Sequence, residues 1–364
     1  QACVSPVWDT GLALIALVES GMPSDHPALV RAGEWLLQKQ VLRPGDWAVK
    51  VKGVEPGGWP FEFANDWYPD IDDTALVIIA LHLACLKDEG AKRQAMERGL
   101  RWILGMQSKN GGWAAFDRDN TRTPLAKIPF ADFGEALDPP SVDVTAHVVE
   151  CLGRLGYDRT HPAVRKALDY IFREQEPDGP WFGRWGVNYI YGTGAVLPAL
   201  EAIGETMNHP RVRRAVEWLL SHQNPDGGWG ESCASYADPS LKGQGPSTAS
   251  QTAWALMALL SAGEGGRLAV ERGVRFLLTT QREDGTWDEP YFTGTGFPGY
   301  GTGERLRYHP KPGEMGLELS AGFMINYHLY RNYWPLMALG RYRQFLEGQY
   351  GLRRSGSAFS RADS

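Results

Sequence analysis

The chain has 364 residues, of which 43% are hydrophobic and 22% charged, and its formal net charge is −6. This composition suits one large soluble domain or two smaller ones, and the negative balance argues against a nucleic-acid partner, because phosphate binding needs a basic face. No apolar run is as long as a membrane span, no secretory signal is visible, and the four cysteines show neither zinc-binding spacing nor a disulfide framework. We therefore expect no metal ion and no other cofactor. The first residue is Gln1 rather than Met, so we expect a fragment of a longer protein.

A repeated pattern organises the chain. Each copy has a basic and a small residue, an aromatic–aliphatic pair, a Gln, and a turn that ends in Gly-x-Trp. The Gln and Trp of the copies are Gln40 and Trp47 (with one extra turn residue), Gln107 and Trp113, Gln175 and Trp181, Gln223 and Trp229, and Gln281 and Trp287. Each copy is typical of a helix that ends near its Gln, after which the Trp folds back and the Gln amide bonds to free backbone groups. We interpret these tryptophans as structural clamps between neighbouring helices.

A second pattern precedes each copy and consists of Thr, a small residue, four further residues, a small residue and Leu. Its first positions are Thr10, Thr74, Thr145, Thr193 and Thr252, and Asn332 takes this place in a sixth unit. The helix that begins here is apolar nearly all round and is expected to be buried, whereas the helix that carries the Gln is amphipathic. Buried helices that alternate with amphipathic ones predict an all-α fold. We expect an (α/α)6 barrel of two concentric layers with parallel inner helices.

The barrel is predicted to span residues 1–350, followed by a disordered polar tail over 351–364. Long Gly- and Pro-rich loops enter the inner helices over 43–69, 114–140, 231–245 and 294–321. Their aromatic content argues against disorder, so we expect these loops to be functional.

Three carboxylates stand where the second buried helix begins: Asp70, Asp72 and Asp73. An aspartate at a helix start accepts backbone N–H bonds, so capping explains one of them, with Asp73 as the candidate. Three carboxylates in four residues are more than a cap needs. Crowding predicts that at least one holds a proton near neutral pH, while the helix dipole favours the anion, and the sequence does not decide between the two effects.

The equivalent turn one unit later contains Asp143 and His147. His147 lies just inside the end of the barrel, so it can face the acid cluster from the adjacent inner helix. A lone His on an apolar helix is more often a core residue, but the neighbouring aspartates favour a functional role. A cationic His beside a carboxylic acid stabilises the carboxylate that remains after proton loss, and so makes a stronger acid.

Several motifs together resemble one family. They are the Gln-x-x-x-Gly-x-Trp repeats, Asp70-Ile71-Asp72-Asp73-Thr74-Ala75, Ser5-Pro6-Val7-Trp8-Asp9-Thr10-Gly11, Gly183-Arg184-Trp185-Gly186-Val187-Asn188-Tyr189, and the segment 291–299. From Ser5 to Arg343 the chain resembles squalene–hopene cyclases, which are class II triterpene cyclases, and matches their acid-bearing C-terminal barrel domain. Oxidosqualene cyclases carry Cys where Asp73 stands, so the resemblance points to squalene, an alkene, rather than to an epoxide.

The resemblance implies roles for the polar residues. Asp72 would donate the proton to a terminal alkene of squalene. Asp70 and Asp73 would hydrogen-bond to Asp72 and tune it. His147 would be the charged partner of the acid and would be held by Asp143.

The resemblance also implies that Tyr191 belongs to the network that reprotonates the acid. The aromatic residues that would line the cavity and stabilise carbocations are Trp8, Phe61, Phe116, Trp185, Phe297, Phe323, Tyr327 and Tyr330. A carbocation in a dry pocket needs negative potential without a nucleophile, which aromatic faces supply. Phe116 stands where many relatives carry Tyr, so a hydroxyl role there is lost. The stretch 300–321 is longer than in the shortest members, and the last three aromatic assignments rest on the motif that follows it.

The implied enzyme is an isomerase that cyclises squalene to hopene, with hopanol formed when water ends the reaction. A second barrel domain of the same chain would complete the cavity, so we expect the present chain alone to have little or no activity. The resemblance further implies monotopic contact with the cytoplasmic face of a bacterial cell membrane, and it allows a homodimer.

Three competing hypotheses stay open. A related class II cyclase would form another triterpene or a diterpene polycycle. A binding or scaffold protein on the same barrel would need neither the acid cluster nor the aromatic loops. Among other enzymes on this fold, prenyltransferase β-subunits need a zinc site that the sequence lacks, and barrel glycosidases use two well-separated carboxylates.

Overall fold

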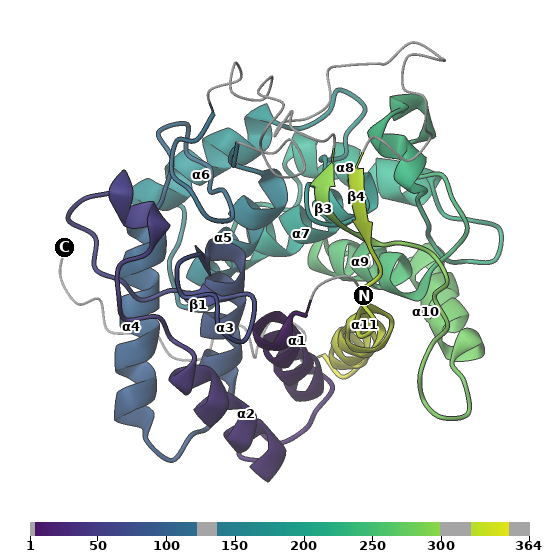
Figure 1. Cartoon of the computed structure of the whole chain (residues 1–364). Coiled ribbons are helices and arrows are strands. Elements are labelled where there is room, and N and C mark those ends of the chain that lie inside the picture. Colours follow the sequence, from purple (N-terminus) through teal and green to yellow (C-terminus); the bar gives the residue numbers. More distant parts are fainter. Residues whose placement is uncertain (1–3, 122–136, 299–321, 349–364) are drawn as a thin grey trace.

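Six helices form a closed inner ring in the computed structural model, which describes residues 4–121, 137–298 and 322–348. The inner helices are α1 (Pro6–Glu19), α3 (Ile71–Leu83), α5 (Val142–Arg154), α7 (Tyr189–Ala202), α9 (Ala249–Ser261) and α11 (Tyr330–Leu346). Each packs against the next in this order, and α11 packs against α1 (Figure 1). The predicted barrel of parallel inner helices is confirmed.

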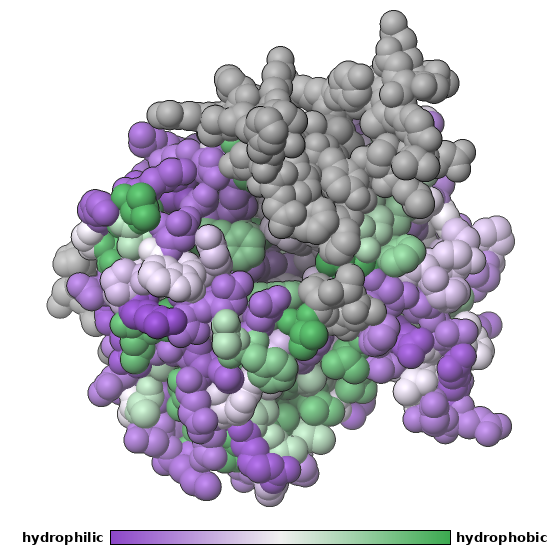
Figure 2. Space-filling model, viewed as in Figure 1, coloured by the Kyte–Doolittle hydropathy of each residue, from purple (hydrophilic) through white to green (hydrophobic). Residues whose placement is uncertain are grey.

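The outer layer consists of α2 (Pro27–Gln38), α4 (Glu89–Gly105), α6 (Pro162–Arg173), α8 (Pro210–Ser221) and α10 (Leu268–Thr280). Each outer helix packs on the inner helix that precedes it. The sixth outer helix that the repeat predicts is not among the residues described, and neither is the tail predicted over 351–364. On the face seen in Figure 2, hydrophobic residues gather over α1 and α11.

Local sequence explains why the two layers differ. All residues of α9 are buried, so this helix is surrounded by protein, whereas α8 buries one apolar stripe that includes Val212, Trp218 and Leu219. Three outer helices begin with a proline, whose missing N–H would be unpaired there in any case. An inner helix such as α5 ends where Gly156 takes a positive φ of 88°, which lets the backbone turn back towards the outer layer.

Short elements occupy the loops at the ends where the inner helices begin. They are the 3-10 helices η1 (Asp46–Val49), η4 (Cys233–Tyr236) and η5 (Pro239–Leu241), the antiparallel pair β1 (Trp59–Pro60) and β2 (Pro69–Asp70), and the antiparallel pair β3 (Gly294–Pro298) and β4 (Gly322–Ile325). In the part of the chain described, no helix is long and apolar enough to cross a bilayer.

The predicted clamps are present. The indole N–H of Trp229 donates to the Leu219 carbonyl at 2.8 Å, and its backbone N–H donates to Thr252 Oγ1 at 2.9 Å, at the start of the next inner helix. The amide of Gln223 donates to the Ala269 carbonyl at 2.7 Å, in the first turn of the next outer helix. Trp113 and Trp181 make the same two contacts, and Gln107 and Gln175 likewise donate to carbonyls of the next outer helix, so each of these clamps joins three helices of successive units.

The repeat pattern predicts the wrong tryptophan for one copy. The clamp of the first unit is Trp59 rather than Trp47, because the Trp59 indole donates to the Leu36 carbonyl at 2.6 Å and its backbone N–H donates to Thr74 Oγ1 at 2.8 Å. The turn is interrupted by a long insertion that contains η1. Trp47 belongs to that insertion, where its ring packs edge-on against Trp102 at 5.9 Å.

The repeat register also determines which side chains point into the lumen. Positions two and five residues after the repeat Thr form two layers that border a cavity of about 30 Å³. The first lumen layer is Leu12, Leu76, His147, Ala195, Trp254 and Trp334, and the second lumen layer is Ile15, Ile79, Glu150, Pro198, Met257 and Met337. The mouth layer lies two residues before the repeat Thr and consists of Trp8, Asp72, Asp143, Tyr191, Ser250 and Tyr330. Most of the candidate polar residues therefore share one end of the barrel.

Candidate active site

The carboxylate cluster begins with a capped helix start. Asp70 is the N-cap of α3, and its Oδ1 accepts the backbone N–H groups of Asp72 at 2.7 Å and Asp73 at 3.2 Å. The prediction that Asp73 is the capping residue is therefore wrong. Asp70 does hydrogen-bond to Asp72, but through the backbone of Asp72, which leaves the Asp72 carboxyl to other partners.

Burial and crowding act together on the two flanking carboxyls. Burial raises the pKa of Asp70 well above its usual value, and the neighbouring Asp72 charge raises it further. Burial likewise raises the pKa of Asp73, with the charges of Asp70 and Asp72 adding to the effect. The raised pKa values agree with the crowding argument. The helix dipole, which stabilises the anion, acts in the opposite direction. The cluster is therefore suited to hold protons near neutral pH.

The centre of the site is a short contact between two inner helices. His147 Nδ1 of α5 lies 2.6 Å from Asp72 Oδ1 of α3, and both side chains are more than nine-tenths buried. Burial by itself would lower the pKa of His147, but the Asp72 carboxylate, followed by Asp143 and Glu150, raises it to about 9. With Asp72 as a carboxylate, His147 is therefore an imidazolium at neutral pH.

Asp143 has a different partner from the one that the family resemblance implied. Its Oδ2 accepts the backbone N–H groups of Arg184 at 3.0 Å and Trp185 at 2.7 Å. Its influence on His147, one turn further along α5, is through charge. Asp143 therefore fixes the loop that carries Trp185 and adds negative potential beside the imidazolium.

Aromatic rings surround the histidine. The centroids of Trp8 and Tyr191 lie 6.3 Å and 6.1 Å from that of His147. The Trp8 indole donates to the Tyr330 hydroxyl at 3.2 Å, and Tyr330 stacks on Tyr327 with 4.4 Å between centroids. Phe61 meets Tyr327 edge-on at 6.4 Å. These five predicted residues thus form one aromatic group around the acid pair.

A second aromatic group borders a larger cavity. Phe116 and Trp185 pack edge-on with 6.3 Å between centroids, and both line a cavity of about 250 Å³. Phe297 and Phe323 are paired positions of the β3–β4 ribbon. This ribbon is attached to the same loop, since the Thr295 N–H donates to the Trp185 carbonyl at 3.2 Å. The sequence-predicted aromatic positions therefore lie on the mouth layer or on the loops above it.

Sequence reasoning missed two residues of this region. Asp138 lines the larger cavity, and its carboxylate accepts the Phe116 and Asp117 backbone N–H groups at 2.6 and 2.7 Å. Trp254 packs edge-on against Tyr191 at 4.8 Å. The signal for Trp254 was present, because it occupies the same repeat position as His147. Asp138 lies in a loop outside the repeat and carried no such signal.

Within the described ranges, no group of three His, Cys, Asp or Glu side chains is arranged to hold a metal ion. Fold and site together define a class of protein, an α/α barrel with a buried aspartate–histidine pair at an aromatic mouth.

Comparisons with known proteins agree with this class. A sequence model of the squalene-hopene cyclase C-terminal domain matches residues 4–310. A squalene–hopene cyclase from Alicyclobacillus acidocaldarius is 55% identical over 95% of this chain and 52% of its own length. A dammaradiene synthase from Dryopteris crassirhizoma is 46% identical over 95% of this chain and 51% of its own length. Among solved structures, the type II terpene cyclase MstE from Scytonema has a TM-score of 0.64 over 93% of this chain and 89% of its own, at 22% identity, which supports the fold.

The chain therefore belongs to the squalene-hopene cyclase family and corresponds to its C-terminal domain. It spans about half the length of the curated relatives that it matches.

Proposed function

We propose that this chain carries the proton donor of a squalene cyclase and that Asp72 is the donor. The observation that carries the proposal is the 2.6 Å contact between Asp72 Oδ1 and His147 Nδ1 in a buried, aromatic setting. In the starting state Asp72 holds a proton and His147 is charged. The Asp72 O–H proton moves to the terminal CH carbon of a squalene alkene, a C–H bond forms from the π electrons, and a tertiary carbocation remains. The imidazolium stabilises the carboxylate left behind, which makes Asp72 a stronger acid.

Ring formation then needs no further acid from the protein. Each alkene attacks the cation in turn, and the positive charge moves along the chain past aromatic faces. A ring face near a desolvated cation contributes roughly 1–2 kcal/mol. Trp8 lies beside His147 and hydrogen-bonds to Tyr330, Phe61 meets Tyr327 edge-on, and Phe116 with Trp185 form the pair beside the larger cavity. Loss of a proton at the end gives hopene, and addition of water gives hopanol.

The roles of Asp70, Asp73 and Tyr191 are part of the same proposal. Asp70 fixes the backbone at Asp72, and the raised pKa values of Asp70 and Asp73 support protonated carboxyls beside the donor. Tyr191 lies against the His147 ring and, within the described residues, its buried hydroxyl has no hydrogen-bond partner. A hydroxyl in that position is available to pass a proton to the emptied carboxylate.

We further propose that a second barrel of the same polypeptide closes the cavity. We also propose that the complete protein contacts one leaflet of a membrane, at the cytoplasmic face of a bacterial cell. The apolar substrate supports the membrane contact, as do exposed apolar side chains between residues 42 and 67: Leu42, Val49, Phe63 and Trp67 are between 56% and 70% exposed, and Trp67 lines the larger cavity. Flotation of the complete polypeptide with liposomes tests this contact, and a protein that stays with the soluble fraction contradicts it. The homodimer stays a prediction.

The test of the function uses the complete natural polypeptide that contains this chain. Incubation with squalene in detergent, followed by mass spectrometry, is expected to give hopene. The Asp72→Asn variant is expected to lose at least 1,000-fold in rate, within about the range that removal of a general acid produces. Asp88→Asn is the matched control, because Asp88 caps the outer helix α4 through the Ala91 N–H at 2.8 Å and is exposed.

Two results would contradict the proposal. A folded wild-type polypeptide that yields no cyclic product from squalene excludes the function, and normal cyclisation by Asp72→Asn excludes the donor. The second candidate is a related class II cyclase with another polycyclic product, which the similarity to a dammaradiene synthase favours over a scaffold protein or a glycosidase. The same product analysis distinguishes it, because a different carbon skeleton appears while the dependence on Asp72 remains.

A further inference from the structure

Helix α5 carries a stripe of charges along the lumen. Asp143, His147, Glu150 and Arg154 follow one another at spacings of four, three and four residues, which places them on one face of a helix. Their charges alternate in sign from the mouth towards the far end of the barrel. Glu150 is the one charged residue of the second lumen layer, whose other members are apolar.

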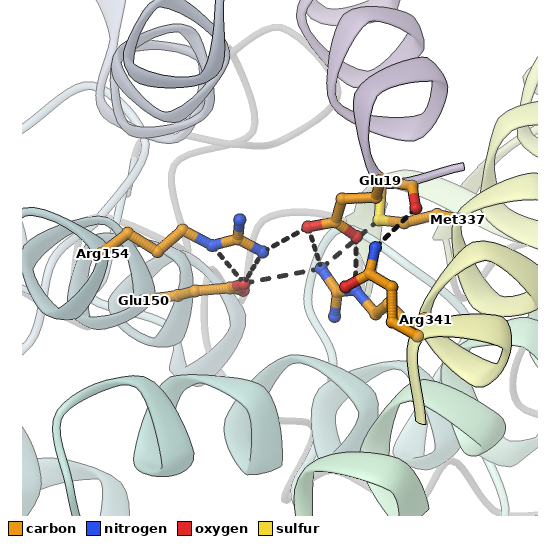
Figure 3. A network of polar contacts seen from close by, with 6 residues as sticks. Glu19, Glu150, Arg154, Met337 and Arg341 are labelled. Carbon is orange, nitrogen blue, oxygen red and sulfur yellow. Dashed lines mark hydrogen bonds and ion pairs between the residues drawn. The ribbon is translucent and has the colours of Figure 1, made fainter. Parts of the chain in front are cut away.

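At the far end, Glu150 belongs to a buried network of ion pairs (Figure 3). Arg154 lies between two carboxylates, with its Nη2 at 2.8 Å from Glu150 Oε1 and 2.7 Å from Glu19 Oε1. Arg341 of α11 pairs with Glu19 and lies 3.6 Å from Glu150 Oε1. The two arginines and two glutamates balance in charge, which a buried network requires. Glu150 is thereby kept as an anion next to the first lumen layer.

The proposed reaction creates an electrostatic problem at His147. The histidine cation has Asp72 as its carboxylate partner at 2.6 Å, but Asp72 must hold a proton before it can donate one. In that state the pair carries an unbalanced buried cation, and a buried His without a counter-ion tends to lose its proton. An imidazole that has lost its proton no longer strengthens the acid. A second carboxylate close to His147 removes this difficulty.

We propose that Glu150 is the second counter-ion of His147 and keeps it protonated while Asp72 carries its proton. This inference rests on the proposed function. Glu150 is three residues after His147 on the same helix, where side chains are neighbours, and both border the 30 Å³ cavity, which has room for about one bridging water. The Glu150 charge also raises the pKa of His147. Glu150 is thus a positioning residue that acts through His147 and does not touch substrate.

The other titratable and charged groups around His147 leave this role to Glu150. They are Asp70 of β2, Asp72 and Asp73 of α3, Asp143 and Arg154 of α5, Tyr191 of α7, Glu19 of α1 and Arg341 of α11. Asp143 also raises the pKa of His147, ahead of Glu150, but burial raises its own pKa and its Oδ2 accepts two backbone N–H groups, whereas Glu150 is paired with two arginine cations. Glu19 lies one layer further away and pairs with both arginines.

The test measures the titration of the imidazole and does not need turnover. In the complete polypeptide labelled with ¹³C-histidine, Asp72→Asn mimics the acid with its proton in place, and NMR follows the His147 resonance with pH. We expect His147 to keep a raised pKa in this background, and adding Glu150→Gln to lower it by about one unit or more, as loss of one nearby charge at an effective dielectric constant of roughly 20 requires.

Two further variants make the result decisive. Glu150→Asp keeps the charge and is the matched control, so in the Asp72→Asn background it is expected to preserve most of the raised pKa. If Glu150→Gln does not fold, Glu150→Gln combined with Arg154→Gln removes one charge of each sign and serves as the test, because compared with Arg154→Gln alone it is again expected to lower the His147 pKa. Equal titration with Gln and Glu at position 150, or a drop that Asp reproduces, overturns the inference. Because no squalene is involved, failure here is distinct from failure to cyclise.

Discussion

Asp138 offers a quantitative test of the electrostatics at the mouth of the barrel. Its carboxylate is buried, and its Oδ2 accepts two backbone N–H groups, from Phe116 and Asp117. Burial raises the pKa of Asp138 from 3.8 to about 6, although the Arg184 charge and the two hydrogen bonds lower it in part. The folded protein therefore holds this proton more tightly than the unfolded chain does.

The sign of the effect on stability follows from this difference. A carboxyl whose pKa is raised by folding destabilises the protein once it ionises, so the penalty is absent below the unfolded pKa near 4 and complete above the folded pKa near 6. A shift of about two units corresponds to roughly 3 kcal/mol. Asp138→Asn removes the charge and keeps an oxygen that can accept both N–H groups, though these neutral bonds are weaker. We therefore expect this variant to gain about 1–3 kcal/mol in the free energy of unfolding at pH 7.5.

The measurement is urea unfolding of the complete polypeptide and its Asp138→Asn variant at pH 7.5 and pH 4. The gain is expected at pH 7.5 and is expected to shrink towards zero at pH 4, where the wild-type carboxyl is also neutral. Asp88→Asn is again the control, because Asp88 is exposed and accepts one backbone N–H, and it should change little at either pH. A variant that is less stable than the parent at pH 7.5, or a gain of the same size at both values, would refute the reasoning.

Two other predictions test the clamp and the proton path. Trp59→Phe is expected to lower the free energy of unfolding by about 1–2 kcal/mol more than Trp47→Phe does. The reason is that the buried Trp59 indole donates to the Leu36 carbonyl, whereas the Trp47 indole has no partner within the described residues. If thermal unfolding ranks the two variants equally, the reassignment of the clamp to Trp59 is wrong. Tyr191→Phe is expected to leave stability unchanged or slightly improved, because the buried Tyr191 hydroxyl has no partner in the described chain. Steady-state cyclisation by this variant is expected to slow at least 10-fold, while the first turnover proceeds normally. An unchanged steady-state rate would exclude Tyr191 from the reprotonation path.

The sequence repeat predicts much of the site as well as the fold. Counting two residues back from each repeat Thr identifies the mouth layer, which includes Trp8, Asp72, Asp143, Tyr191 and Tyr330. Resemblance to a family points to these residues, yet helix periodicity alone places them at one end of one lumen. The fold was predictable because inner helices are apolar all round and outer helices are not.

The features that the sequence could not predict depend on the course of the loops between the repeats. Trp59 replaces Trp47 as a clamp because an insertion separates Gln40 from its Gly-Gly-Trp turn, and both tryptophans fit the Gly-x-Trp motif, so that motif alone does not distinguish them. Asp138 is a loop residue whose importance comes from two amides that approach it in space. The sequence pattern places Glu150 on a buried helix. It does not predict the ion pair of Glu150 with Arg341, which comes from α11.

The packing of α11 against α1 has a consequence for the folding of the protein. Trp8 and Tyr330 meet there at 3.2 Å, and Glu19 meets Arg341 there, although each pair is separated by 322 residues. Contacts of such long sequence separation form late, because the loop that they close is nearly the whole chain. The aromatic wall beside the acid and the ion pairs at the far end therefore both depend on the same packing of α11 against α1. A nascent or partly unfolded chain has the aspartates but lacks this surrounding, so the capacity for strong-acid chemistry arises together with the completed ring.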